Sequence, residues 1–172
     1  MASIEGVGVG APAGATPSSR GNRLRVLRAL VQTDDRPAPA VLRIGLGLVM
    51  FPHGAQKVLG SFGGGGFSKT MAYFTDVVHL PTVLGLSVIA AEFVGSLMLL
   101  AGIFTRFAAC SIGLVMAGAA VLVHAPNGFF MNWFGNQAGE GFEFHLLAIA
   151  IAAALVIMGG GRWSLDRSLS RP

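Results

Sequence analysis

The apolar segment at residues 80–104 limits what this chain can fold into. It carries one charged residue, Glu92, and it exceeds the roughly 20 residues that an α-helix needs to cross a bilayer. Two further apolar segments follow, at residues 107–124 and at about residues 142–161. An all-α integral membrane protein is therefore predicted, and the lipid bilayer is its first expected partner.

The composition of the whole chain agrees with this class and excludes several others. Hydrophobic residues make up 53% of the 172 residues and charged residues only 12%, about half the charged share of a soluble protein. Disordered chains, nucleic-acid-binding domains and almost all soluble enzymes contain a larger share of polar and charged residues than this chain. The one cysteine, Cys110, excludes an internal disulfide and a multi-cysteine metal centre. We expect Cys110 to be a packing residue, and we expect no metal site.

A fourth apolar segment, residues 39–59, is interrupted by Arg43, Pro52, His53 and Lys57. Each charge in a spanning helix costs about 2.5–3.5 kcal/mol, so neighbouring helices must hold this segment in place. The predicted fold is an integral membrane four-helix bundle over residues 39–167.

The ends of the chain differ from the bundle in composition. Residues 1–38 are predicted to form a cytoplasmic arm, disordered over residues 1–19, and residues 168–172 a short tail. The five arginines of residues 20–36 fit either an amphipathic helix on the membrane surface or a solvated basic tail. Basic residues before the first segment, at Arg106 and after the fourth segment place both termini in the cytoplasm. The long connections at residues 61–79 and 125–141 then face outward.

Ionisable residues inside membrane segments are candidate functional residues. Arg43, His53 and Lys57 fall on one face of the first helix, because their spacing follows the helical repeat. Arg43 and Lys57 could instead extend to the two membrane surfaces. Glu92 shares a face with small residues (Gly85, Gly95 and Ser96), which is typical of a helix–helix contact. Glu92 is therefore expected to point into the bundle.

The third helix carries a row of mostly small residues that leads to His124 at its outer end, namely Arg106, Cys110, Gly113, Ala117 and Ala120. The fourth helix opens with Glu143 and His145, which diverge by about 200° around the axis. A rise of 1.5 Å per residue puts His53 and Glu92 within about one turn of each other in depth, so we expect them to be in contact. Lys57, His124 and Glu143 would form a ring above them, around a polar pocket that opens outward.

Several segments, taken in order, resemble the DoxX family of membrane proteins. The segments that carry the resemblance are residues 42–47 (LRIGLG), 53–57 (HGAQK), 92–95 (EFVG), 100–106 (LAGIFTR), His124, residues 142–143 (FE) and 161–166 (GRWSLD). The resemblance covers about residues 40–167 and implies a four-helix protein of the bacterial inner membrane. It also implies an association with quinol-oxidising redox systems.

Two functions follow as expectations. The first is a quinone-interacting subunit of a membrane oxidoreductase, with His53, Lys57 and Glu92 in the catalytic pocket. Arg43, His53, His124 and Glu143 are the candidate cofactor-binding residues. No motif encodes a cofactor, so a quinone is the one considered, and electrons would come from a redox partner protein. The second function is a non-catalytic scaffold that recruits a partner.

Three other readings carry less weight. A small transporter is disfavoured because the chain lacks paired, broken half-helices. A haem or metal held by His53 and His124 is geometrically feasible but has no spacing motif. A homo-oligomer stays open, and no nucleic acid is expected.

Overall fold

A computed structural model describes residues 25–26, 28–33 and 35–170 of the chain, and this part is helical, with no strand. The membrane helical fold expected from the sequence is thus confirmed. The elements, in chain order, are α2 (Pro37–Leu59), α3 (Gly66–Ala72), η1 (Tyr73–Val77), α4 (Thr82–Ala101), α5 (Thr105–Ala119), η2 (Ala120–His124), η3 (Ala125–Asn127), α6 (Glu143–Met158) and α7 (Leu165–Ser170).

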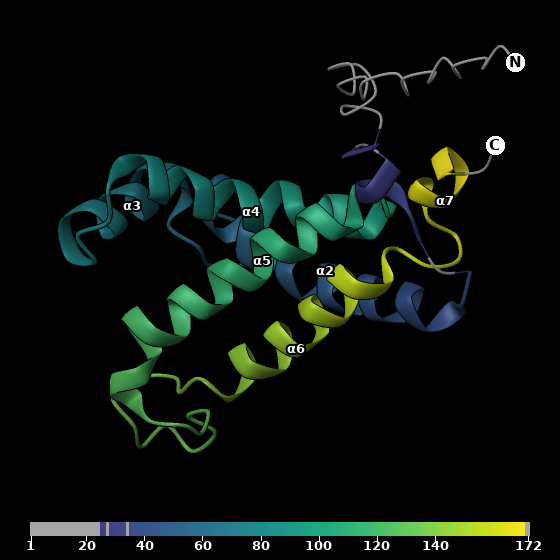
Figure 1. The fold of residues 1–172 in the computed structure, drawn as a ribbon. Helices are drawn as coiled ribbons and strands as arrows, with labels where there is room; N and C mark the ends of the chain where they lie inside the picture. The colour runs from purple at the N-terminus through teal and green to yellow at the C-terminus, as the bar shows by residue number, and fades with distance from the viewer. Residues whose placement is uncertain (1–24, 27, 34, 171–172) are drawn as a thin grey trace, which may run out of the picture.

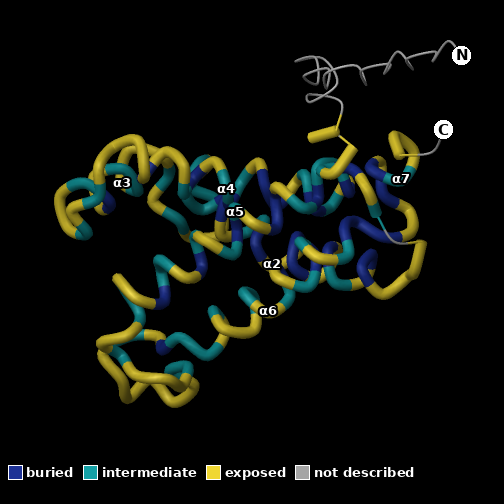
Figure 2. Tube along the Cα trace, in the orientation of Figure 1, coloured by how far each residue is buried: buried dark blue, intermediate teal, exposed yellow. Residues whose placement is uncertain are grey.

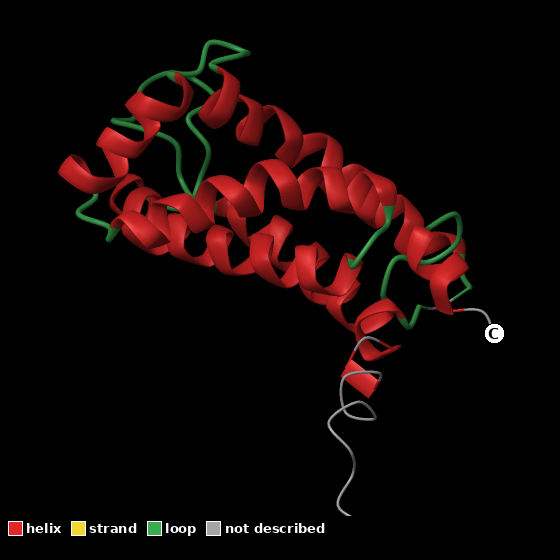
Figure 3. Cartoon of the chain, turned by 90° about the horizontal axis from the view of Figure 1, so that it is seen from above, coloured by secondary structure: helices red, strands yellow, loops and turns green. Residues whose placement is uncertain are grey.

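The four long helices α2, α4, α5 and α6 lie beside one another in an elongated bundle (Figures 1 and 3). α2 packs mainly on α4, and α5 packs mainly on α6. The core is apolar and comes from all four helices, with fully buried Leu99, Ile112 and Leu155 at its centre. Figure 2 shows the buried residues along the inside of the bundle and the exposed ones along its outer surface.

Each end of the bundle has a distinct set of connections. We call the end at which α2 begins and α7 lies the terminal end, and the end that carries α3 and residues 128–142 the loop end (Figure 1). The two long connections predicted from the sequence therefore lie at one end, as expected. The first is not an open loop, because it contains α3 and η1.

Three helices among the described residues are long and apolar enough to cross a membrane: Pro37–Leu59, Thr82–Ala101 and Thr105–Asn127. The interrupted first segment is thus one continuous helix, with Pro52 inside it. The fourth segment forms α6, which has only 16 residues. At 1.5 Å per residue α6 is about 24 Å long, whereas the hydrocarbon core is about 30 Å thick. A fourth crossing remains a prediction.

The close contact between α2 and α4 depends on Gly54. A Cβ atom at this position would lie 2.5 Å from the Cα atom of Phe93, so only glycine allows the two backbones to meet here. Nearer the terminal end, Gly47 of α2 lies against the side chain of Leu100 on α4. A Cβ atom at Gly47 would lie 3.0 Å from Cγ of Leu100. The small-residue face of α4 is buried as predicted, including Gly85, Gly95 and Ser96. This contact places Lys57 and His53 beside Glu92.

The buried face of α5 differs from the predicted row of small residues. Cys110 and Ala117 are exposed, and the buried residues are Thr105, Ala108, Ala109, Ile112 and Met116. The expectation that Cys110 packs inside the bundle is therefore wrong. Ile112 and Met116 are buried in the bundle. The predicted row of small residues faces outward only in part, because Ala120 is buried and the Cβ position of Gly113 lies 3.3 Å from Cβ of Ala152 on α6.

The predicted disordered tract at residues 1–19 lies outside the described residues. Residues 25–26 and 28–31 are helical, and Val31 is buried. Residues 32–36, apart from residue 34, are hydrogen-bonded to the terminal end of the bundle through Gln32 and Arg36. The Arg106 side chain donates to the Gln32 carbonyl at 3.0 Å, and the Arg162 amide donates to the Arg36 carbonyl at 3.1 Å.

Candidate functional site

The main polar contact inside the bundle is an ion pair between α2 and α4. Lys57 Nζ donates to Glu92 Oε2 at 2.5 Å. The Glu92 side chain is 5% exposed and that of Lys57 is 23% exposed, so the pair lies inside with an opening on the lysine side. A cavity of about 270 Å³ meets Lys57 at that opening, between α2 and the α3–η1 segment. Glu92 therefore points into the bundle, as predicted.

His53 lies one helical turn from Lys57 on the same side of α2. It interacts electrostatically with both Lys57 and Glu92, and its ring is exposed. The hydrogen-bond partner of Glu92 is Lys57 rather than His53. The structure thus brings together the three residues predicted for the catalytic pocket.

A second group of side chains lies at the loop end, where α5 and α6 approach each other. The rings of His124 and His145 are 4.2 Å apart between centroids. Nδ1 of His124 is 2.8 Å from the Glu140 carbonyl oxygen. Nδ1 of His145 is buried and has no hydrogen-bond partner in the described part of the chain.

Glu143, which the sequence placed in a ring with Lys57 and His124, has its hydrogen bonds elsewhere. Its Oε1 atom accepts hydrogen bonds from the Met131 amide at 3.3 Å and from Trp133 Nε1 at 3.4 Å. Glu143 therefore holds the connection that precedes α6. No group of three or more potential metal ligands occurs within residues 25–26, 28–33 and 35–170.

Arg43 belongs to a separate cluster at the terminal end. The residue is 2% exposed, so it does not extend to the membrane surface. Its Nε donates to the Gly160 carbonyl at 2.9 Å, and its Nη2 donates to the Trp163 carbonyl at 2.7 Å. Its Nη1 donates to the carbonyls of Leu99 at 2.8 Å and Leu100 at 2.7 Å. Four of the five guanidinium N–H groups are thus bound to backbone oxygens at the ends of α4 and α6.

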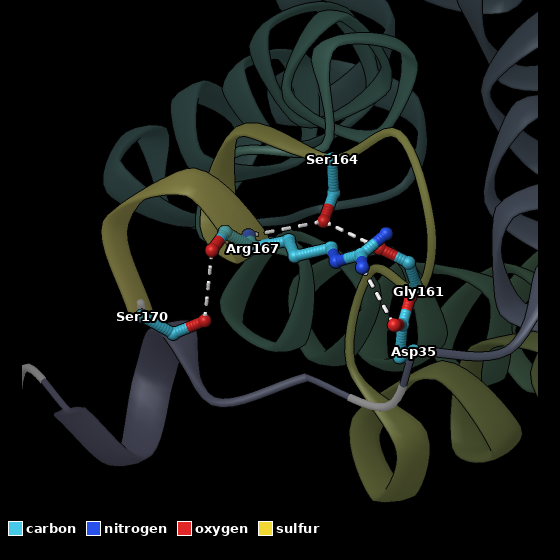
Figure 4. Close-up of polar contacts among 5 residues, drawn as sticks. All are labelled: Asp35, Gly161, Ser164, Arg167 and Ser170. Atoms are coloured by element: carbon cyan, nitrogen blue, oxygen red, sulfur yellow. Dashed lines mark hydrogen bonds and ion pairs between the residues drawn. The ribbon is translucent and has the colours of Figure 1, made fainter. Parts of the chain in front are cut away.

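Asp166 completes the terminal-end cluster. Its carboxylate accepts the amides of Phe104 at 2.7 Å and Thr105 at 2.8 Å, which are free donors at the start of α5. Nearby, the Ser164 hydroxyl donates to the Gly161 carbonyl at 2.7 Å and accepts the Arg167 amide at 3.2 Å (Figure 4). Figure 4 also shows Arg167 paired with Asp35 at 2.6 Å, which ties α7 to the segment before α2.

The family model described as DoxX matches residues 38–125, which hold α2, α4, α5 and the Lys57–Glu92 pair. This chain belongs to the DoxX family. It is 29% identical over 154 residues to an uncharacterized membrane protein of Mycobacterium tuberculosis, covering 83% of this chain and 87% of that protein. It is 26% identical over 81 residues to an uncharacterized protein of Haemophilus influenzae, covering 47% and 50% of the two chains. No solved structure matches.

Within this DoxX protein, the sequence did not single out Asp166, Glu140 or the pairing of His145 with His124. Asp166 was visible only as the last residue of the quoted GRWSLD segment. Its role depends on a partner some sixty positions away in the chain. The position of His145 could have been used to predict its place, because it lies on the opposite side of α6 from Glu143.

Proposed function

We propose that this DoxX protein is a quinone-interacting subunit of a membrane-associated oxidoreductase. The observation that carries the proposal is the Lys57–Glu92 ion pair, flanked by His53 inside an apolar helical bundle. A paired charge at this depth is costly to place in a membrane. The proposed setting is the bacterial inner membrane, with four crossings and both termini in the cytoplasm. This orientation puts the arginines at the terminal end inside.

The residues at this site fit a quinone head group chemically. A quinone presents carbonyl oxygens that accept hydrogen bonds, and its reduction takes up protons together with electrons from a redox partner protein. Lys57 and His53 supply donors, and Lys57 is open to the cavity beside α3. Glu92 holds the lysine ammonium in place. The imidazole of His53 is a group that can both give up and take up a proton.

The other proposed cofactor-binding residues take different places around this site. His124 and Glu143 lie at the loop end but do not line the cavity at Lys57, so any contact with a quinone would be indirect. Arg43 lies at the terminal end, with four of its donors bound to carbonyls, so its part is to fix the helices.

A scaffold function is the second candidate, and the Arg43 and Asp166 clusters favour it. Both clusters show that this bundle uses buried charges to hold helices together. In this alternative, the Lys57–Glu92 pair serves packing in the same way, and the protein recruits a partner without binding a quinone.

Measuring the quinone that stays bound during purification separates the two candidates. The wild-type chain in mild detergent should retain quinone in a fixed ratio to protein, and the Lys57→Met variant should lose it. Lys69→Met is the matched control, because Lys69 lines the same cavity without a carboxylate partner in the described part of the chain. Wild-type protein without quinone but with a co-purifying protein would refute the first candidate and support the scaffold.

A further inference from the structure

An exposed aromatic surface lies at the loop end, in the connection between η3 and α6. We call residues 129–134 the aromatic segment; it contains Phe129, Phe130, Trp133 and Phe134. Three of these are strongly exposed: Phe130 at 66%, Trp133 at 70% and Phe134 at 90%. Exposed large apolar side chains that are contiguous in this way mark an interaction surface.

The aromatic segment continues the exposed side of α6. The ring of Trp133 lies 6.2 Å from that of Phe144, measured between centroids. Trp133 also borders an apolar crevice of about 280 Å³ whose other walls include Phe144 and Leu147. Phe144 and Leu147 are both exposed on α6. The aromatic surface and the outer face of this apolar helix therefore form one continuous surface.

Three backbone amides of the aromatic segment donate hydrogen bonds within the protein, which lowers the cost of placing them away from water. The Met131 amide donates to the Glu143 carboxylate, and the Asn132 amide donates to the Glu140 carboxylate at 2.7 Å. The Trp133 amide donates to the Met131 carbonyl at 2.9 Å. Both acidic side chains thus turn toward the segment's backbone.

α6 is too short to cross the hydrocarbon core by itself, so an apolar segment next to its first residue would extend the crossing. α6 is about 6 Å shorter than a hydrocarbon core of about 30 Å. Residues 125–141 contain no lysine or arginine, and residues 135–139, which follow the aromatic segment, are small or polar. The connection therefore has an aromatic half and a polar half, the distribution found at a membrane interface.

We infer that the aromatic segment is inserted into the interface of the bilayer that surrounds the helices. In this arrangement Phe130, Trp133 and Phe134 lie among the lipid head groups and the first part of the acyl chains. Residues 135–140 face water. The lipid surface is thus the partner of this segment, and the inference is independent of any quinone at Lys57.

Tryptophan fluorescence in lipid vesicles tests this inference, because the chain has two tryptophans, Trp133 and Trp163. Trp163→Phe leaves Trp133 as the reporter. The matched control carries Asn136→Trp together with Trp133→Phe and Trp163→Phe, which moves the reporter to the polar half of the same connection. Each full-length variant is reconstituted in phosphatidylcholine vesicles after its melting temperature has been checked against the wild type.

Phosphatidylcholine brominated near the head of its acyl chains should quench Trp133 and leave the reporter at position 136 largely unaffected. Aqueous iodide should give the opposite order, and the emission of Trp133 should be shifted to shorter wavelength. Quenching of Trp133 by iodide without quenching by brominated lipid would refute the inference and place the segment in water. Resistance to both quenchers would also refute it, because a protein surface would then cover Trp133.

Discussion

Breaking the Lys57–Glu92 pair from either side should destabilise the bundle, and removing both charges should restore part of the loss. Lys57→Met leaves a carboxylate that is 5% exposed without its partner, and breaking a buried pair this way costs about 3–5 kcal/mol. Glu92→Leu leaves Lys57, which is 23% exposed and closer to the loop end. Because a lysine can extend toward the membrane surface, we expect a smaller loss of about 2 kcal/mol.

The double variant Lys57→Met/Glu92→Leu contains no unpaired charge at this site. Since apolar replacement of a whole buried pair is often close to neutral, the double variant should be more stable than Lys57→Met alone. The two single losses add up to about 5–7 kcal/mol. A coupling of about 3 kcal/mol, the upper end of the values found for residues in contact, would leave the double variant about 2–4 kcal/mol less stable than the wild type. A shift of about 2–4 °C per kcal/mol turns this coupling into about 6–12 °C in melting temperature, measured in detergent by differential scanning fluorimetry.

Strict additivity of the two single changes, within about 0.5 kcal/mol, would refute the ion pair as the structure shows it. The matched cycle uses His53→Leu in place of Lys57→Met. His53 has no hydrogen bond to Glu92, so this cycle should give a coupling below about 1 kcal/mol. A larger coupling for His53 than for Lys57 would show that the histidine is the main partner of Glu92.

Three further outcomes are expected. Gly54→Ala should lower stability by about 1–3 kcal/mol, because its Cβ would collide with the α4 backbone, whereas Gly45→Ala, with nothing within 4 Å, should not. Arg43→Met should lower stability by about 3 kcal/mol or more, because four backbone carbonyls lose their donor. Thermal melts of the Gly54→Ala and Arg43→Met variants check these two predictions. A cysteine at Asn136 should react with an impermeant thiol reagent on intact spheroplasts, and one at Ser168 only after lysis; the reverse labelling would overturn the orientation.

The buried face of α4 could be predicted from the sequence, but that of α5 could not. On α4 a charged residue, Glu92, shares its row with small residues, and both features point to a helix contact. On α5 the row with Cys110 and Ala117 has only small residues between Arg106 and His124, and no charge at mid-helix. Lipid is as apolar as the bundle interior, so hydrophobic periodicity does not separate inward from outward faces. Residue size then gave the wrong row, because Ile112 and Met116 fill the interior.

Helical spacing and depth predicted that Lys57, His53 and Glu92 form one cluster. They did not predict that Lys57, rather than His53, pairs with Glu92. Depth arithmetic carries an uncertainty of about one turn, which is the distance between His53 and Lys57. The terminal-end clusters were beyond sequence reasoning for a different reason. The partners of Arg43 and Asp166 are backbone carbonyls and amides, which every residue has and no motif marks.

The Arg43 contacts also impose an order on how the protein is made. Arg43 lies in α2, and its acceptors at Leu99 and Leu100 are synthesised more than fifty residues later. Those at Gly160 and Trp163 come more than a hundred residues later. Until then the guanidinium must find water, a lipid phosphate or the insertion machinery, because an isolated charge is costly in the hydrocarbon. The connection between α6 and α7 therefore completes the hydrogen bonds of a residue in α2. A chain cut short before residue 160 would lack two of the four acceptors of Arg43.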